Sequence, residues 1–438
     1  MVEGPKKGGI NGFRMQLLAL SLVLVTGLAQ DVEESMTTSE VISNWGYPVE
    51  TYDIITTDGY ILNMLRIPHG QASTNNSSCH RPPLLMLHGL MGDASEFVIN
   101  PPESSPGMIL ADAGFDIFML NVRGTYYSQR HVNLTKDDRE YWKFSTDDIV
   151  KYDLPAAIDK SLELNGAKAL YIVGHSQGTL ISFMLLADLP EYNRKVRAMF
   201  ELAPVGNIRY IRVFGRFLYR IVVSVKGILD FYKVHLGAHE FGLHSPRLLG
   251  GAARFVCGPL FNYEASYSFF FVLAPSVKFV FMSMFQLCRD IIFIGAGPPS
   301  RTFNFSRVPL YLSNFFVSTS TWNILQYGQT LLHNAVYHFD HSPTENLRRY
   351  GQIAAPPYNY SNIDTDVYLF WSRNDWTTTP YEIEKWIIPH MRPVVIKNTF
   401  EIPEYNHLDF VLATDCREKV FSKIIAVVRE KELDACLL

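Results

Sequence analysis

The sequence predicts an α/β fold, in which a mostly parallel sheet is covered by helices on both faces. Short, continuous apolar runs rich in branched side chains alternate with helical patterns along most of the chain. The composition is 47% hydrophobic and only 19% charged, so the chain can bury a large core. The length of 438 residues accommodates such a domain together with a large insertion.

The elements expected in chain order begin with a hairpin, because Thr51–Thr56 and Tyr60–Arg66 flank the turn signal Asp58-Gly59. Buried strands are expected at Leu84–His88, Ile117–Asn121, Ala169–Val173, Ala198–Leu202, Val367–Trp371 and Val394–Phe400. Helical patterns such as Asp147–Leu164 and Thr179–Leu189 separate these runs. Strands alternating with helices favour a parallel sheet.

The alternation stops between about residues 207 and 359, where the chain becomes helical, aromatic and irregular, and it resumes afterwards. We therefore expect a first core part over residues 30–206, an insertion over 207–359 and a second core part over 360–438. Within the insertion, Tyr267–Leu287 is as long as a membrane span. It contains Pro275, Lys278 and Gln286, which favour a buried or interface-facing segment over a transmembrane helix.

Residues 1–29 have the features of a signal peptide. Basic residues at positions 6, 7 and 14 precede the apolar run Leu17–Ala29, which is short for a membrane span, and Gly27 and Ala29 fit a cleavage site. An uncleaved anchor is the alternative. Candidate glycosylation sequons begin at Asn75, Asn76, Asn133, Asn304 and Asn359. We expect a secreted protein, with the lysosomal lumen as the alternative, in which the odd number of five cysteines leaves at least one thiol unpaired or intermolecular.

The pentapeptide G-H-S-Q-G at residues 174–178 lies between an expected strand and an expected helix. In a strand, tight turn and helix, this pattern exposes the serine hydroxyl and aims helix N–H groups toward developing negative charge. The sequence therefore predicts Ser176 as a nucleophile.

A serine nucleophile needs a base and an acid that orients the base, in the chain order serine, acid, histidine. Asp375 follows the strand expected at 367–371, whereas Asp364 and Asp366 precede it and belong to the opposite edge of the sheet. His407 follows the last expected strand, and His390 precedes it. We therefore predict Asp375 as the acid and His407 as the base.

The oxyanion formed in acyl transfer needs two preset donors. The backbone N–H of Gln177, directly after the nucleophile, is expected to be one of them. The second is expected from the loop after an early strand, where His88-Gly89 begins a loop of the esterase type, and we assign it to the N–H of Leu90.

Other chemistries have little support in the sequence. A net charge of −4 without a long basic run argues against nucleic-acid binding. His239 and His244 are five residues apart, whereas a zinc helix places its histidines four apart, so no metal is expected. Without a phosphate loop or a G-x-G-x-x-G fingerprint, no nucleotide cofactor is expected either.

At these residues the chain resembles the acid lipase family of gastric and lysosomal lipases and their insect relatives, within the α/β-hydrolase superfamily. The motifs that carry the resemblance are Asn44-Trp45-Gly46-Tyr47-Pro48, Thr57-Asp58-Gly59-Tyr60, His88-Gly89-Leu90, Lys151-Tyr152-Asp153-Leu154-Pro155, Gly174-His175-Ser176-Gln177-Gly178, Asn374-Asp375-Trp376 and His407-Leu408-Asp409-Phe410. The resemblance implies the same triad and oxyanion hole. It also implies that the insertion before Asp375 is a mostly helical cap over the active site. Cys257 and Cys288 resemble the family's paired cysteines, although they lie further apart in this sequence.

The function expected from the residues and the resemblance is a secreted or luminal serine lipase without a cofactor. Its substrates would be fatty-acyl esters, either acylglycerols or sterol esters, met at a lipid–water interface. Two alternatives stay open: a short-chain carboxylesterase with a closed cap, and a non-catalytic lipid-binding protein that uses the same scaffold.

Overall fold

The structure is a computed structural model that describes residues 32–72, 79–212, 238–242, 293, 295–333, 335–433 and 435. Its strands are β1 (Glu50–Ile55), β2 (Tyr60–Ile67), β3 (Pro83–Leu87), β4 (Asp116–Asn121), β5 (Arg130–His131), β6 (Leu170–His175), β7 (Val196–Leu202), β8 (Glu240–Phe241), β9 (Thr319–Ser320), β10 (Asp366–Trp371) and β11 (Ile396–Glu401). Its α-helices are α2 (Thr38–Asn44), α3 (Pro106–Asp112), α4 (Thr146–Asp148), α5 (Leu154–Asn165), α6 (Gln177–Asp188), α13 (Val308–Asn314), α14 (Thr321–Leu332), α15 (Pro343–Tyr350), α16 (Pro380–Glu382), α17 (Ile388–His390), α18 (Asp409–Leu412) and α19 (Ser422–Lys431).

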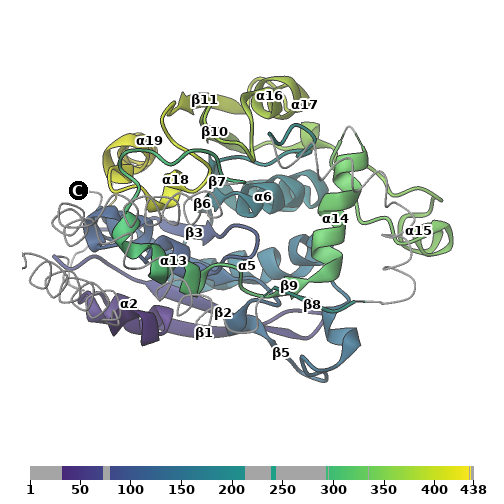
Figure 1. The fold of residues 1–438 in the computed structure, drawn as a ribbon, viewed down its shortest axis with the longest axis horizontal. Coiled ribbons are helices and arrows are strands. Elements are labelled where there is room, and N and C mark those ends of the chain that lie inside the picture. The colour runs from purple at the N-terminus through teal and green to yellow at the C-terminus, as the bar shows by residue number, and fades with distance from the viewer. Residues whose placement is uncertain are drawn as a thin grey trace, which may run out of the picture.

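The central sheet has the strand order β1-β2-β4-β3-β6-β7-β10-β11, with β5 paired to β2 (Figure 1). The first strands are antiparallel, since β2 pairs antiparallel with both β1 and β4. From β4 to β11 every neighbouring pair is parallel. The predicted hairpin and mostly parallel sheet are confirmed, and each predicted strand begins and ends within two residues of its observed bounds. The prediction that all six strands are buried is wrong for β11, whose residues are exposed or half-buried because the strand lies at the edge of the sheet.

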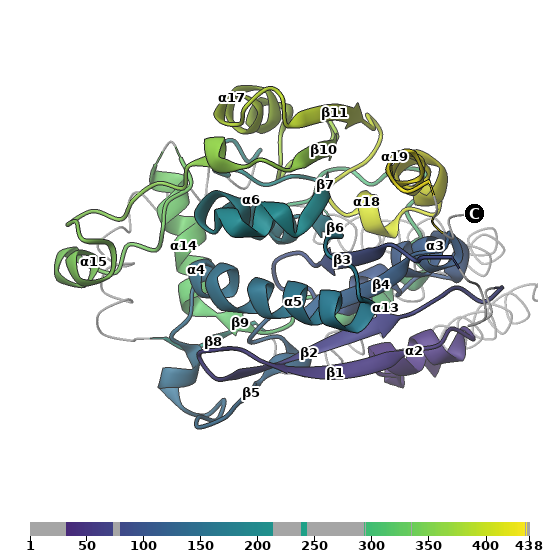
Figure 2. The same cartoon turned by 180° about the vertical axis from the view of Figure 1, so that it is seen from behind.

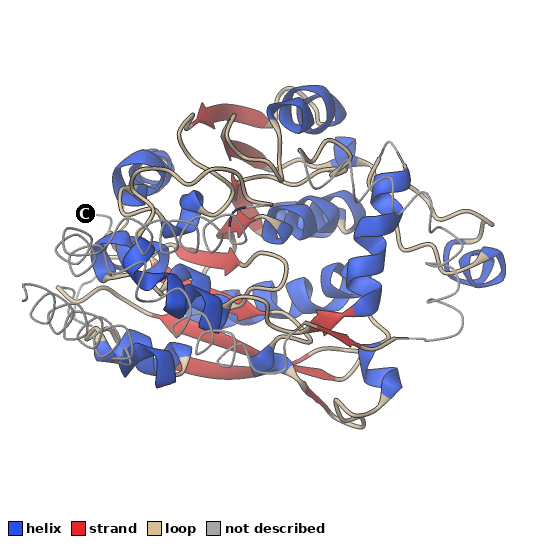
Figure 3. Ribbon diagram, in the orientation of Figure 1, coloured by secondary structure: helices blue, strands red, loops and turns tan. Residues whose placement is uncertain are grey.

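Helices cover both faces of the sheet (Figures 2 and 3). Side chains alternate along each strand, so Leu84 and Met86 of β3 join the core under α3, α18 and α19. Leu85 and Leu87 join the core under α5 and α6, which Figure 2 shows in front of the sheet. Every residue of β3 is buried, which explains why the strand is continuously apolar rather than alternating in polarity.

The single helix expected over 147–164 consists of α4, a π-helical turn at Ile149–Asp153 and α5. Pro155 lies two residues after this turn. A proline inside a helix lacks an N–H donor and clashes with the preceding turn, so a wider turn in front of it relieves the clash. The same arrangement recurs at the π-helical turn Ile383–Ile387, which is followed by Pro389.

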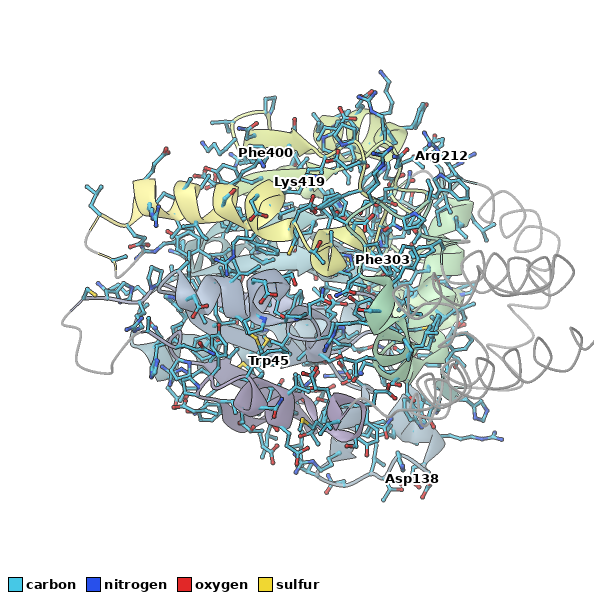
Figure 4. The ribbon with its side chains drawn as sticks, turned by 60° about the vertical axis from the view of Figure 1, so that its left-hand side comes forward. Trp45, Asp138, Arg212, Phe303, Phe400 and Lys419 are labelled. Atoms are coloured by element: carbon cyan, nitrogen blue, oxygen red, sulfur yellow. The ribbon has the colours of Figure 1, made fainter. Side chains whose placement is uncertain are left out.

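Within residues 207–359, where the insertion is expected, the described part of the chain contains α13, α14, α15 and the two-strand ladder of β8 with β9. Phe303 packs onto the core, because it forms an antiparallel bridge with Ala413, and its ring lies 5.6 Å from that of Tyr311 in α13. Figure 4 shows Phe303 between α13 and α18. Phe303 therefore connects α13 to the chain that follows the last strand.

Several predicted features lie outside the described residues: the signal peptide, the apolar segment at 267–287, and the residues Asn75, Asn76, Cys257 and Cys288. Across the described part of the chain, no helix combines the length and apolar character that crossing a bilayer requires. Cys79 is disulfide-bonded, and Cys416 is a buried free thiol.

Candidate active site

Ser176 occupies the sharp turn between β6 and α6. Its backbone angles are φ 52° and ψ −115°, a strained conformation that L-residues rarely adopt. The flanking glycines make the turn possible. A Cβ atom on Gly178 would lie 2.0 Å from the carbonyl oxygen of Leu87, and one on Gly174 would lie 2.6 Å from Oε2 of Glu201. Strand and helix can therefore approach closely enough to hold the hydroxyl clear of the sheet.

The fold brings Ser176 together with the two residues predicted to assist it. Nε2 of His407 lies 2.8 Å from Oγ of Ser176, and Nδ1 of His407 lies 2.8 Å from Oδ2 of Asp375. The three residues follow β6, β10 and β11, and the carboxyl ends of parallel strands meet at one edge of the sheet. Because the Asp375 carboxylate can only accept, Nδ1 carries the proton and Nε2 is free to accept the serine proton.

The carboxylate of Asp375 is buried and fully hydrogen-bonded. Its Oδ1 accepts from the backbone N–H groups of Thr377 and Thr378, both at 2.8 Å. Its Oδ2 accepts from Oγ1 of Thr378 at 2.6 Å, in addition to the imidazole of His407. These donors stabilise the ionised carboxylate and fix the side chain so that one oxygen faces the imidazole.

The residues rejected from the sequence lie elsewhere. Asp364 pairs with Arg392. Asp366, at the start of β10, accepts from Lys431 at 2.5 Å, on the edge of the sheet opposite Asp375. His390 ends α17, where its Nδ1 lies 2.6 Å from the carbonyl oxygen of Trp386.

Ala296 supports both the loop of Asp375 and the loop of His407. The carbonyl oxygen of Ala296 accepts from the N–H of His407 at 3.0 Å and from the N–H of Trp376 at 3.3 Å. Trp376 directly follows Asp375 in the chain. A single carbonyl group therefore holds the loop of Asp375 and the loop of His407 at a fixed separation, and nothing in the sequence marks Ala296 for this role.

The two predicted oxyanion donors belong to segments next to Ser176: Gln177 follows it directly, and a Cβ atom on Gly89, the residue before Leu90, would lie 3.4 Å from Cβ of Ser176. The N–H of Gln177 lies in the first turn of α6, where N–H groups have no partner within the helix. Among the described residues, no acceptor takes the N–H of Leu90. The Gln177 side chain is held by α14, since its Nε2 donates to Oδ1 of Asn323 at 3.2 Å, and Oγ1 of Thr146 donates to the same oxygen at 2.6 Å.

Two further buried polar residues lie beside the nucleophile, Glu96 and His175. Oε1 of Glu96 lies 3.2 Å from Nδ1 of His175. Burial lowers the pKa of His175, but Glu96, the backbone of His407 and Asp375 together outweigh burial, so that this pKa lies above its ordinary value. His175 occupies a variable position of the G-x-S-x-G motif, and no sequence signal marks Glu96.

Of the predicted glycosylation sites that the structure describes, Asn133 and Asn359 are exposed, and Asn304 is half-buried. Oδ1 of Asn359 accepts from Oγ of Ser361, the serine of its own sequon, at 2.7 Å. The modification itself stays a prediction at all three sites.

Chemically, this arrangement can activate a hydroxyl for attack on a carbonyl. A neutral imidazole within hydrogen-bond distance of the serine can take its proton, and the buried carboxylate stabilises the imidazolium that results. Backbone N–H groups next to the nucleophile can receive the negative charge of a tetrahedral intermediate. The geometry is therefore suited to acyl transfer.

Comparisons with known proteins agree with this fold. The family described as "partial alpha/beta-hydrolase lipase region" matches residues 38–101, and the "alpha/beta hydrolase fold" family matches residues 82–253. Lipase lipl-1 of Caenorhabditis elegans is 34% identical over 412 residues, covering 94% of this chain and 95% of the relative. Gastric triacylglycerol lipase of Bos taurus is 32% identical over 404 residues, covering 92% of this chain and 94% of the relative. The chain belongs to the acid lipase family of gastric and lysosomal-type lipases, with the α/β-hydrolase fold.

Proposed function

We propose that this protein is a secreted or luminal serine lipase that hydrolyses fatty-acyl esters through an acyl-enzyme on Ser176. The observation that carries the proposal is the continuous hydrogen-bonded chain from Ser176 through His407 to Asp375, with both donor–acceptor distances at 2.8 Å. A non-catalytic lipid-binding protein would not need these three side chains in this arrangement.

In the first half-reaction, Oγ of Ser176 attacks the ester carbonyl carbon while Nε2 of His407 takes the hydroxyl proton. The carbonyl oxygen becomes an oxyanion that the N–H groups of Leu90 and Gln177 stabilise. The intermediate collapses, the carbon–oxygen bond to the alcohol breaks, and Nε2 of His407 gives its proton to the leaving oxygen.

In the second half-reaction, water replaces the alcohol. His407 takes a proton from the water, whose oxygen attacks the acyl carbon and forms a second oxyanion in the same position. Collapse breaks the bond to Oγ, and His407 returns the proton to Ser176, which releases the fatty acid. No metal or cofactor is needed in either half-reaction.

The substrates proposed are acylglycerols or sterol esters at a lipid–water interface. The named relatives include a gastric triacylglycerol lipase, which supports a lipid ester over a water-soluble one. Residues 207–359 would form the cap, whose aromatic runs at 269–273 and 279–284 suit an acyl-chain channel. Both runs lie outside the described residues. The 1–29 segment and the sequons support a secreted protein or, alternatively, a lysosomal one.

The test of this function is hydrolysis of p-nitrophenyl esters from acetate to palmitate by the wild type and by Ser176→Ala. The wild type should prefer long chains, and the variant should lose about 10⁴–10⁶ in turnover while keeping its melting temperature. A wild type that cleaves acetate fastest and palmitate slowly would be a short-chain esterase. A variant within tenfold of the wild type would overturn the assignment of the nucleophile.

We further propose a cap disulfide between Cys257 and Cys288. Since Cys79 is already disulfide-bonded and Cys416 is free, this pairing would leave Cys436 as the partner of Cys79 within the chain. Mass spectrometry of unreduced peptides should find both linked pairs. Finding Cys257 and Cys288 as free thiols would refute the cap bridge.

A further inference from the structure

A second carboxylate–imidazole pair lies directly behind the nucleophile. Glu96 belongs to the short 3-10 helix η2 (Ala94–Phe97), and His175 is the last residue of β6. Their side chains are 4% and 3% exposed, and Oε1 of Glu96 lies 3.2 Å from Nδ1 of His175. Burying two charged groups is unfavourable unless their polar atoms find partners. Neither residue belongs to the triad of Ser176, His407 and Asp375.

Each member of the pair also binds a main-chain group of the active site. The N–H of Gly89 donates to both carboxylate oxygens of Glu96, at 3.1 and 3.2 Å. Nε2 of His175 lies 3.0 Å from the carbonyl oxygen of His407. The pair therefore connects the loop that contains Leu90 to the residue that acts as the base, and Ser176 directly follows His175 in the chain.

The same loop fixes the direction of the Leu90 N–H. The carbonyl oxygen of Gly89 accepts from the N–H of Gly92 at 3.1 Å and lies 2.9 Å from Nδ1 of His88. In a planar trans peptide the C=O and the following N–H point in opposite directions. Since Glu96 holds the Gly89 N–H and the loop holds the Gly89 carbonyl, Leu90 has a preset donor direction.

Hydrogen-bond chemistry fixes the protons of the pair. A carbonyl oxygen only accepts, so Nε2 of His175 carries a proton toward His407. Nδ1 of His175 faces a carboxylate oxygen, which also accepts, so a good contact requires a proton there too. The pair is then an imidazolium beside a carboxylate, with each of its N–H groups directed at a different part of the site.

We propose that Glu96 and His175 are positioning residues for ester hydrolysis, a charged bridge that holds the oxyanion loop and the main chain of His407 at fixed places on either side of Ser176. This inference rests on the proposed roles of Ser176, His407 and Leu90. The bridge acts through those groups and touches neither the ester nor the water.

The bridge has a consequence for the pH dependence of turnover. If His175 loses a proton, one N–H remains for two acceptors, and the bridge opens at one end. Turnover should therefore fall on the alkaline side. The other titratable groups that face the pair are His88 and Asp93 from the loop after β3, Asp375 after β10, and the ring of His407, whose centroid lies 5.4 Å from that of His175.

The experiment compares Glu96→Ala with Glu96→Gln in the full-length protein, on p-nitrophenyl butyrate. Alanine removes the contacts of Glu96 with Gly89 and with His175, so kcat should fall about 100-fold while KM changes less than threefold, since misplacing one oxyanion donor has an effect of this order. In Glu96→Gln, the amide oxygen can accept from Gly89 and the amide N–H can donate to neutral His175. This variant should keep kcat within tenfold of the wild type and lose the alkaline decline.

The matched control is Asp116, the first residue of β4, which lies on the opposite edge of the sheet. Its buried carboxylate lies 2.8 Å from Nε of Arg66. Asp116→Ala should lower the melting temperature without changing kcat per folded molecule. The proposal is overturned if Glu96→Ala keeps kcat within threefold, or if Glu96→Gln and the wild type have the same pH profile. If Glu96→Ala does not fold, the pH profiles of kcat for Glu96→Gln and Asp116→Asn are compared with that of the wild type. The proposal then requires that Glu96→Gln loses the alkaline decline and that Asp116→Asn keeps it.

Ser176→Ala is measured in parallel to separate the two proposals. If Ser176→Ala remains active, the proposed function itself fails. If Ser176→Ala is inactive while the Glu96 variants behave like the wild type, only the positioning role fails.

Discussion

Replacing Asp375 by asparagine tests how the acid orients the base. The two donors at Oδ1, the N–H groups of Thr377 and Thr378, can be satisfied only by an oxygen, so the asparagine oxygen should occupy that position. Its NH₂ group then replaces Oδ2 and faces Nδ1 of His407. An N–H donor there forces Nδ1 to accept and puts the imidazole proton on Nε2, where it can no longer take the proton of Ser176.

The expected magnitude follows from this wrong tautomer. Loss of a correctly oriented base costs about 10⁴ in turnover, which corresponds to about 5.4 kcal/mol in activation free energy. The assay is the kcat for p-nitrophenyl butyrate, with the melting temperature measured on the same protein. The variant also loses the acceptor for Oγ1 of Thr378, so its melting temperature should fall by a few degrees.

The controls are Asp364→Asn and Asp366→Asn, which change carboxylates on the opposite edge of the sheet and should leave kcat within threefold. The reasoning is refuted if Asp375→Asn keeps kcat within tenfold of the wild type while either control variant loses it.

Two further predictions concern the scaffold. Gly178→Ala should prevent folding or lower the urea midpoint of unfolding sharply, since its Cβ would lie 2.0 Å from the Leu87 oxygen. The control variant Gly295→Ala should keep the wild-type midpoint, because nothing lies within 4 Å of the added Cβ. An unchanged midpoint for Gly178→Ala would contradict the close approach of helix and strand. Burial lowers the pKa of His338, but its two aspartate partners raise it overall to about 9. A raised histidine pKa stabilises the fold below about pH 6.5, and this contribution of about 3 kcal/mol is lost as the pH rises through 9. His338→Gln should therefore flatten the fall in melting temperature between pH 6 and 9.5, and a slope equal to that of the wild type would argue against this role.

The triad could be predicted from the sequence because its positions follow from topology. Ser176 lies in a motif that needs a strand before it and a helix after it, and both patterns are plain in the sequence. Once a parallel sheet is predicted, residues after its strands meet at one edge. This reasoning selected Asp375 over Asp366 and His407 over His390, and the structure brings the selected pair together with Ser176.

The support around the triad could not be predicted in this way. Glu96 lies in a 3-10 turn without periodicity, and it meets His175 across 79 residues of chain. The backbone carbonyl of Ala296 accepts from the backbone N–H of His407. Neither side chain takes part, so the contact cannot be predicted from the residue types. Contacts made by main-chain atoms and by single buried polar residues depend on the final packing, which periodicity does not encode.

The central claim is that Ser176 is the nucleophile, and covalent labelling tests it most directly. A fluorophosphonate should modify the wild type once per chain, and peptide mapping by mass spectrometry should place the adduct on Ser176. His407→Ala should slow labelling by several orders of magnitude, because the hydroxyl loses its base. An adduct on any other residue of the active protein, or full labelling of Ser176→Ala, would contradict the account.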